Sequence, residues 1–332
     1  MSNTVYPRSL SPEDKNALEL FYKKAYPHRN DISEYLNRNI FSLPFCQIKD
    51  TLVIYDGDSI VGSNLSINTK ALIGSEEYDV IWSFDTIVLP EYRSTDAGTF
   101  IGEFWFTHKE VFGAGLTDIS ERMWKVMKGK FIAYATAFIK LNYTSPYIFN
   151  FFKPILSNEK VLKKKFPELL NTKKSTFTKL SSAAEIKIPA EGYWNSEMIE
   201  FKRDVDFIKW RFFKQDSPYH VYQKNSDDCV YFVVRLIEWH NLPLLYIVDY
   251  RFNLNNTKDF NEILAAANKI VKKLNCAGLY IRCSLETLKD ICKNHGFIMK
   301  GQGAQIVTRF KPAVKKDYPV FFTAADSDMD FK

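Results

Sequence analysis

The sequence predicts an α/β protein built from two domains. The chain has 332 residues, and one domain usually takes about 100–200 of them. Hydrophobic residues make up 46% and charged residues 25%, so the composition suits a buried core and argues against extensive disorder. Both halves of the chain also show one order of elements: a strand meander, a helix, a strand, a helix and a strand. We interpret this repetition as a structural duplication.

In the first half, Ser11 is expected to cap the first helix, which carries a stripe of apolar residues. In the helix expected over residues 119–128, Ile119, Met123 and Val126 share one face, which we expect to point into the core. The remaining elements are strands over residues 52–55, 59–67, 78–89 and 131–141, and a helix over residues 98–111.

In the second half, one helix has a strongly periodic apolar pattern, and the next helix is expected to end at Gly296. The run Ala277-Gly278-Leu279 resembles Ala114-Gly115-Leu116 of the first half, which supports the duplication. The expected strands cover residues 219–223, 229–237, 244–251, 278–283, 304–311 and 320–323, and the expected helices cover residues 260–274 and 285–292.

A change in composition predicts where the domains divide. Residues 151–195 are rich in lysine and serine, and we interpret them as a linker with a helical connection. The first domain then covers residues 1–150 and the second covers residues 196–332.

Charge, cysteines and hydropathy limit the classes of function. The net charge of +6 is mild and suits a small polyanionic ligand as well as nucleic acid. The five cysteines form no CxxC pair, which favours reduced thiols in the cytoplasm over a metal site. We see no signal peptide and no apolar run of membrane-spanning length, so neither export nor a membrane partner is expected. Nothing in the sequence predicts the oligomeric state.

The most informative segment runs from Trp82 to Glu103. It predicts a buried strand that stops at Pro90, a loop of small residues, and a helix. A loop that enters a helix collects unpaired amides, and these amides with the helix dipole favour a phosphate group. Arg93 adds a positive charge at the loop entrance. The segment is therefore a candidate pyrophosphate site.

This segment resembles the hallmark of the GNAT (GCN5-related) acyltransferases, V-x-P-x-x-[R/Q]-x-x-G-x-[G/A]. Val88, Pro90, Arg93 and Gly98 fit that pattern, whereas Asp96 stands where the family prefers glycine. Two further runs, residues 210–212 and the tail at 322–328, resemble tandem GNAT-like proteins associated with the acylation of bacterial surface sugars or amino acids. The resemblance implies two GNAT-like folds, each a mixed and mostly antiparallel sheet with helices on both faces.

The resemblance also implies an acyl-coenzyme A site in the first domain, as a co-substrate site for acetyl-coenzyme A or another acyl-coenzyme A. The central strands would separate after Val88. Asp96 would either turn outward beside a working site or cap the helix in place of a phosphate. The amides implied for the pyrophosphate belong to Arg93, Ser94, Thr95, Asp96, Ala97 and Gly98, and those implied for the thioester and pantetheine to Ile87, Val88 and Leu89.

The implied reaction is attack of a neutral amine on a thioester, which needs a base and a proton for the thiolate but no metal. Asp85 is the acid near the middle of the strand and would take the amine proton, unless it pairs with an arginine or faces solvent. The family often places a tyrosine acid shortly before a glycine–phenylalanine pair. Lys125 stands there in the first half and Cys292 in the second, so Lys125, Tyr134 or water would supply the proton.

The predicted function is N-acylation of a primary amine on a small molecule, of the amino sugar or amino acid type. One alternative is a non-catalytic module that has lost coenzyme binding. Another is an aminoacyl-transfer enzyme of the related duplicated fold that uses charged transfer RNA. That enzyme would need a clear basic groove, and we do not expect a nucleic-acid partner. The acidic tail, with Asp326, Asp328 and Asp330, is expected to be solvated.

Overall fold

The computed structural model describes residues 5–41, 48–73, 76–107, 110–152, 164–188, 197–214, 216–225, 230–310 and 318–327. Its residues form two compact units, which we describe separately. The first unit contains Met1–Ala71, Glu77–Ile132 and Gln305–Asp317, and the second contains Leu72–Glu76, Ala133–Ala304 and Tyr318–Lys332. Each unit is assembled from separate stretches of the chain, whereas the expected division at residues 150 and 195 follows the order of the chain.

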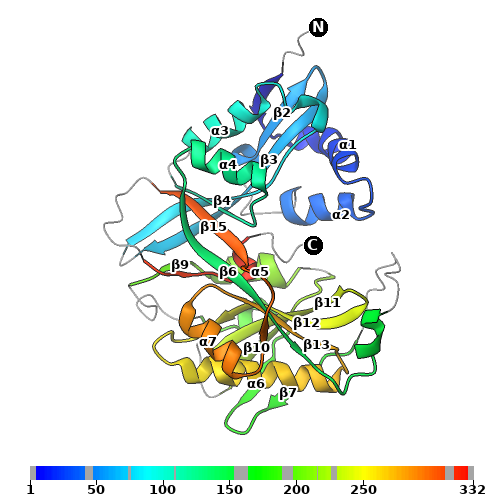
Figure 1. Cartoon of the computed structure of the whole chain (residues 1–332), viewed down its shortest axis with the longest axis vertical. Coiled ribbons are helices and arrows are strands. Elements are labelled where there is room, and N and C mark those ends of the chain that lie inside the picture. The colour runs from blue at the N-terminus through cyan, green and yellow to red at the C-terminus, as the bar shows by residue number, and fades with distance from the viewer. Residues whose placement is uncertain are drawn as a thin grey trace. The chain divides into compact units, whose positions relative to one another are not determined.

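The sheet of the first unit has the strand order β1-β2-β3-β4-β5-β15 (Figure 1). The pairs β1–β2, β2–β3 and β5–β15 are antiparallel, and β4–β5 is parallel. The strands are β1 (Tyr6–Ser9), β2 (Leu52–Asp56), β3 (Ser59–Ile73), β4 (Glu76–Val88), β5 (Glu110–Ala114) and β15 (Ala304–Phe310).

Four α-helices belong to this unit among its described residues. In the view of Figure 1, α1 and α2 lie on one side of β2 and β3, and α3 and α4 lie on the other. A stacked pair of rings, Trp105 of α3 and Trp124 of α4, joins the last two helices with 4.6 Å between ring centroids. The bounds are α1 (Lys15–Ala25), α2 (Ile32–Leu36), α3 (Ala97–Thr107) and α4 (Asp118–Val126), with short helices at Pro12–Asp14, Asn37–Phe41, Ile48–Asp50 and Pro90–Tyr92.

Two expectations for these helices are wrong. The helix predicted over residues 98–111 ends at Thr107, and Val111 is instead buried in β5, where an apolar run before a glycine suits a buried strand as well as a helix. The predicted inward face of α4 is also wrong. Ile119 and Val126 are 59% and 79% exposed, whereas Trp124 is the residue of this helix that is buried. One large aromatic side chain therefore orients α4 in place of three smaller ones.

The second unit has the strand order β6-β13-β12-β11-β10-β8-β7, with β14 beside β6, and it also contains the parallel pair of β9 and β16. The strands are β6 (Lys130–Leu141), β7 (Leu169–Asn171), β8 (Thr176–Lys179), β9 (Ile199–Phe201), β10 (His220–Lys224), β11 (Tyr231–Trp239), β12 (Leu242–Arg251), β13 (Gly278–Cys283), β14 (Ile298–Met299) and β16 (Val320–Phe321). The helices are α5 (Val205–Phe212), α6 (Thr257–Lys273) and α7 (Glu286–Asn294), with short helices at Ile148–Phe152, Ala183–Glu185 and Ala324–Asp326.

The core of the second unit lies between these central strands and α6 and α7. Phe260, Ile263, Ala267 and Ile270 of α6 are fully buried against it, as the periodic pattern of the sequence predicts. Gly296 ends α7 with a φ of +77°, a left-handed conformation that favours glycine. Cys276, Cys283 and Cys292 are free and buried, while Cys46 and Cys229 lie outside the described residues.

The two units repeat one arrangement, which confirms the predicted duplication. In each, a strand is followed by a helix and a parallel neighbour, β4-α3-β5 in the first unit and β12-α6-β13 in the second. A strand that comes later in the chain exchanges between the two copies: β6, which follows β5 and α4, pairs with β13, and β15, which follows β13, α7 and the short β14, pairs with β5. Among the described residues, no helix has the length and apolar character needed to span a membrane.

Candidate active site

The parallel pairing of β4 and β5 stops well before β4 ends. Paired residues run from Ile81 with Val111 to Ser83 with Gly113, but β4 continues to Val88. The separation expected after Val88 therefore begins five residues earlier, after Ser83. The last part of β4 keeps β3 on one edge, because the amide of Leu89 donates to the carbonyl of Val61 at 2.9 Å, and has left β5 on the other.

A bulge lies where β4 leaves β5. The hydroxyls of Ser83 and Thr86 both donate to Oδ1 of Asn64, each at 2.6 Å. Residues three positions apart in a regular strand face opposite sides of the sheet, so one extra residue must be accommodated between these two. Asp85 takes that place with a φ of +45°. A non-glycine residue in this left-handed region is strained and is typical of bulges beside functional sites.

The amide of Val88 lies on the edge of β4 that no longer pairs with β5. Leu89 uses its amide for the ladder with β3, and amides of adjacent strand residues point to opposite edges. Of the amides implied for the thioester, that of Leu89 is therefore occupied, and that of Val88 points toward the vacated edge. Outside the ladder with β3, Thr86 and Val88 are hydrogen-bonded within the described chain only to Asn64 and to Nε of Arg93, which donates to the Val88 carbonyl at 3.2 Å.

The loop after Pro90 uses some of its amides internally. The amides of Arg93 and Thr95 donate to Pro90 and Tyr92 carbonyls, and the amide of Ala97 donates to Oγ1 of Thr95. These three amides are therefore occupied, although the resemblance implied them for the phosphate site. No described residue accepts a hydrogen bond from the amides of the remaining loop and first-turn positions, namely Ser94, Asp96, Gly98 and Thr99.

Asp96 and Gly98 leave room at this helix start. Asp96 is exposed, precedes the first residue of α3, and its carboxylate accepts no hydrogen bond from a described residue. It therefore does not cap the helix. A Cβ built on Gly98 would meet nothing within 4 Å. Four uncommitted amides beside an open backbone position at the start of an eleven-residue helix have the arrangement needed for a phosphate group.

Asp85 is held by two tyrosines from outside the sheet. Its Oδ1 accepts the hydroxyl of Tyr26, which follows α1, at 2.9 Å, and its Oδ2 accepts the hydroxyl of Tyr35 in α2. The side chain is half-buried and lies in the strand segment that has left β5. The sequence pattern predicts Asp85 but neither tyrosine, because the contacts link positions 50 and 59 residues apart.

The residues proposed as the acid differ in their surroundings. The side chain of Lys125 is 72% exposed on α4 and forms an ion pair with Glu121 at 2.6 Å, an ordinary helix-surface arrangement. Tyr134 is half-buried in β6. The hydrogen bond to Cys283 and burial raise the pKa of the Cys292 thiol, so this thiol is a poor proton donor. Among the described residues, no group of acidic, histidine and cysteine side chains has the arrangement of a metal site.

The second unit fills its corresponding strand end with its own chain. Pairing of β12 with β13 stops at Ile247 with Ile281, while β12 continues to Arg251. The hydroxyl of Ser284, just after β13, donates to the carbonyl of Val320 at 2.6 Å and accepts the amide of Phe322 at 2.9 Å. The segment from residue 320 to 327 thus lies at this strand end.

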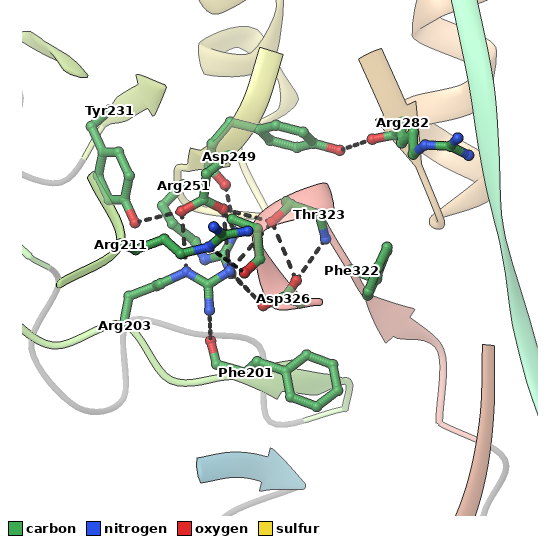
Figure 2. Close-up of polar contacts among 12 residues, drawn as sticks. Phe201, Arg203, Arg211, Tyr231, Asp249, Arg251, Arg282, Phe322, Thr323 and Asp326 are labelled. Carbon is green, nitrogen blue, oxygen red and sulfur yellow. Dashed lines mark hydrogen bonds and ion pairs between the residues drawn. The ribbon is translucent and has the colours of Figure 1, made fainter. Parts of the chain in front are cut away.

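A buried ionic cluster fixes this segment (Figure 2). Asp249 bonds Arg203 at 3.1 Å and Arg251 at 2.8 Å, and Asp326 bonds the same two arginines. All four side chains are 0% exposed. Burial alone would raise the pKa of Asp249, but the charges of Arg203 and Arg251 hold it below its usual value.

The expectation of a solvated tail is therefore wrong for Asp326, and Asp328 and Asp330 lie outside the described residues. Arg211 of α5 donates to the carbonyls of Ala325 and Ser327 at 3.3 and 3.0 Å. The two runs that resemble tandem GNAT-like proteins, around Arg211 and in the tail, are thus in direct contact.

Solved structures with the same fold come from two groups of acyltransferases. A GCN5-related N-acetyltransferase from Anabaena variabilis has a TM-score of 0.59 at 10% identity, over 92% of this chain and 72% of that chain. A probable N-acyltransferase from Enterococcus faecalis gives the same values. N-myristoyltransferase from Saccharomyces cerevisiae with bound myristoyl-CoA has a TM-score of 0.59 at 14% identity, over 94% of this chain and 80% of that chain.

No family model and no curated protein matches the sequence. At these identities the comparison shows the fold: a two-lobed, roughly duplicated GNAT-type fold with a mixed, mostly antiparallel sheet flanked by helices. The fold predicted from the Val88 to Gly98 motif is confirmed.

Proposed function

We propose that this protein is an acyl-coenzyme A-dependent N-acyltransferase whose acyl site lies in the first unit. One observation carries the proposal: β4 leaves β5 after Ser83 and leads into a loop with uncommitted amides at Ser94, Asp96, Gly98 and Thr99. An acyl-coenzyme A carries both a thioester and a diphosphate. The gap beside the strand edge gives room and a free amide for the thioester, and the loop at the end of that strand gives a site for the diphosphate.

The roles of the residues follow from their positions. The uncommitted loop amides hold the diphosphate, and Arg93 adds positive charge at its edge. The amide of Val88 donates to the thioester carbonyl and to the oxyanion that forms from it. Asp85 takes the proton of the amine, and Lys125 or water returns a proton to the thiolate. The acceptor is a primary amine of the amino sugar or amino acid type, and the reaction takes place in the cytoplasm, in keeping with the free cysteines.

Titration calorimetry with acetyl-coenzyme A and myristoyl-coenzyme A tests the proposal, and we expect one of them to bind in the micromolar range. Release of coenzyme A thiol in the presence of ethanolamine, glucosamine and lysine then tests transfer. Absence of binding by both thioesters at millimolar concentration would instead identify a non-catalytic module with this fold.

A further inference from the structure

A four-residue loop interrupts a strand of the second unit. In the first copy of the duplicated fold, the strand that follows α4 is β6, which runs for 12 residues as a single strand. In the second copy, the strand that follows α7 is divided into β14 and β15 by the residues 300–303, which we call loop 300–303. Such an interruption gives up ladder hydrogen bonds that the other copy keeps, so the architecture of the fold does not by itself explain the loop.

The backbone of loop 300–303 has the form of an anion-binding nest. Gly301 and Gly303 have φ values of +71° and +93°, and Gln302 between them does not have a positive φ. Such alternation turns successive amides toward one side, where they form a concave site for an anion. The amides of Gly301, Gln302 and Gly303 donate to no described residue, so all three are available to a ligand.

Loop 300–303 is open at one glycine and held against β6 at the other. A Cβ built on Gly301 would meet nothing within 4 Å. A Cβ built on Gly303 would lie 2.6 Å from the Cα of Thr136 and 2.7 Å from the carbonyl oxygen of Ala135, so only glycine allows the backbone to come this close. Arg282 reaches the same point, because its Nη1 donates to the carbonyl of Ala135 at 3.3 Å.

Two cationic residues, Arg282 and Lys300, project from one face of the sheet at this loop. Arg282 of β13 lies opposite Ala137 of β6. On the other edge of β6, where β14 pairs, the amide of Lys300 donates to the carbonyl of Ala137 at 2.8 Å. Residues opposite one another on neighbouring antiparallel strands have their side chains on the same face. Arg282 and Lys300 therefore stand on either side of a small alanine, and no bulky residue of β6 separates them.

Neither of these two cations has an acidic partner among the described residues. Figure 2 shows the side chain of Arg282 pointing away from the buried ionic cluster, and its buried Nε donates to no described residue. Nζ of Lys300 lies 4.1 Å from the centroid of the Trp239 ring, and burial and the charge of Arg282 lower the pKa of Lys300. Like charges side by side disfavour each other, and a bound anion would relieve their repulsion.

We propose that loop 300–303, with Arg282 and Lys300, binds a phosphate monoester. The two cations supply two positive charges, and a phosphate monoester carries a charge of about −1.5 to −2 at neutral pH. Its three terminal oxygens accept the amides of the loop and the forked donors of Arg282. A carboxylate has one charge and would leave one cation without a partner. The site goes beyond the proposed function, because its residues all belong to the second unit.

NMR of the whole chain labelled with 15N-glycine tests this site directly, because the chain has 13 glycines. Inorganic phosphate should shift the amide signals of Gly301 and Gly303 in a saturable way, with a dissociation constant in the millimolar range. Sodium chloride and sodium acetate at the same ionic strength should not shift them. Gly301→Asn assigns the first signal by its loss, since asparagine tolerates a positive φ. Glutamine labelled with 13C at the carbonyl assigns the second, because Gln302-Gly303 is the one Gln-Gly pair of the sequence.

Arg282→Met and Lys300→Met each remove one charge and keep a long side chain, so each should weaken phosphate binding about tenfold. The matched control is Lys273→Met, which makes the same change of charge at the exposed end of α6 and should leave phosphate binding unchanged. Gly98→Val alters the loop proposed for the diphosphate and should leave the phosphate-induced shifts of loop 300–303 as they are in the wild type.

Two phosphate monoesters distinguish the sources of such a group. Glucosamine 6-phosphate represents a phosphorylated acceptor, and adenosine 3′,5′-bisphosphate represents the nucleotide end of the coenzyme. Tighter binding of either one than of inorganic phosphate supports the inference and identifies the class of ligand.

Unchanged signals of Gly301 and Gly303, equal shifts with acetate, or wild-type affinity for phosphate in both Arg282→Met and Lys300→Met would overturn the inference. Acyl-coenzyme A binding without phosphate-induced shifts in loop 300–303 removes the inference and leaves the proposed function standing. Phosphate-induced shifts in this loop without acyl-coenzyme A binding do the reverse.

Discussion

Oγ1 of Thr323 donates a hydrogen bond to Oδ1 of Asp249 at 2.6 Å, and both residues are fully buried. The bond joins the C-terminal segment to the strand end that corresponds, in the first unit, to the proposed acyl site. One copy of the duplicated fold thus holds part of its own chain where the other copy would hold a substrate. Under the proposed function, only the first copy then needs the Arg93 to Gly98 loop.

Binding of acyl-coenzyme A should have a stoichiometry of one per chain. The strand end of the second unit is occupied by residues 320–327, so a second molecule has no place to bind there. The calorimetric titration that tests binding also measures this ratio. Two equivalent sites would show that the C-terminal segment is displaced by the ligand.

Gly98→Val should weaken acyl-coenzyme A binding at least about tenfold, because a branched side chain would fill the space that the phosphate needs. It should not lower the melting temperature, since a Cβ at this position meets nothing within 4 Å and valine is the better helix former. Thr107→Val puts the same side chain on the exposed last turn of α3 and serves as the control. Equal affinities for the two variants would contradict the placement of the phosphate site.

Asp326→Asn should lower the free energy of unfolding by about 3–5 kcal/mol, because it leaves Arg203 and Arg251 with too little buried negative charge. Urea denaturation measures the change. The control is Asp290→Asn, which removes an exposed carboxylate bound to Lys293 at 2.9 Å and should cost at most about 1 kcal/mol. Similar losses for both variants would mean that the buried cluster contributes little.

His220 should make the protein less stable in mild acid. Burial and the charge of Lys179 lower its pKa from 6.5 to about 4, and its ring stacks on Phe166 with 3.7 Å between centroids. Below pH 6.5 the imidazole of His220 therefore binds a proton in the unfolded chain, whereas in the folded chain it binds one only near pH 4. The stabilising contribution is complete above pH 6.5 and is lost as the pH falls toward 4.

The loss should be roughly 2 kcal/mol, since one unit of pKa corresponds to about 1.4 kcal/mol and the ring is partly exposed to solvent. His220→Phe keeps the stacking and should flatten the stability profile between pH 6.5 and 4, as followed by urea denaturation at several pH values. His240→Asn changes an exposed turn residue that has a positive φ and should keep the profile of the wild type. A profile that His220→Phe leaves unchanged would refute this assignment.

Local patterns predicted most of the elements. The strands β10 to β13 and the helix α6 follow from alternation and from the 3.6-residue period, both of which depend on neighbours in sequence. The buried face of α4 was predicted wrongly because Trp124 buries more area than Ile119 and Val126, and its stacking partner Trp105 lies on another helix.

Part of the candidate site could also be predicted from the sequence. The motif from Val88 to Gly98 identifies the loop, and Asp85 is the acidic residue of that strand that lies nearest to the loop. The bulge at Asp85 and its tyrosine partners were not predictable, because they depend on the packing of α1 and α2 against β4. The buried position of Asp326 was missed for the same reason: its partners Arg203 and Arg251 come from distant parts of the chain.

The membership of β15 in the first sheet has a consequence for synthesis on the ribosome. The antiparallel neighbour of β5 is not complete until residue 310, long after the rest of that sheet has emerged. At about 5–20 residues per second, the nascent chain waits on the order of ten seconds or more with one edge of β5 unpaired. During that time the exposed strand edge is open to pairing with other chains, so slow elongation or a premature stop codon near the end of the message should favour aggregation over a stable amino-terminal fragment.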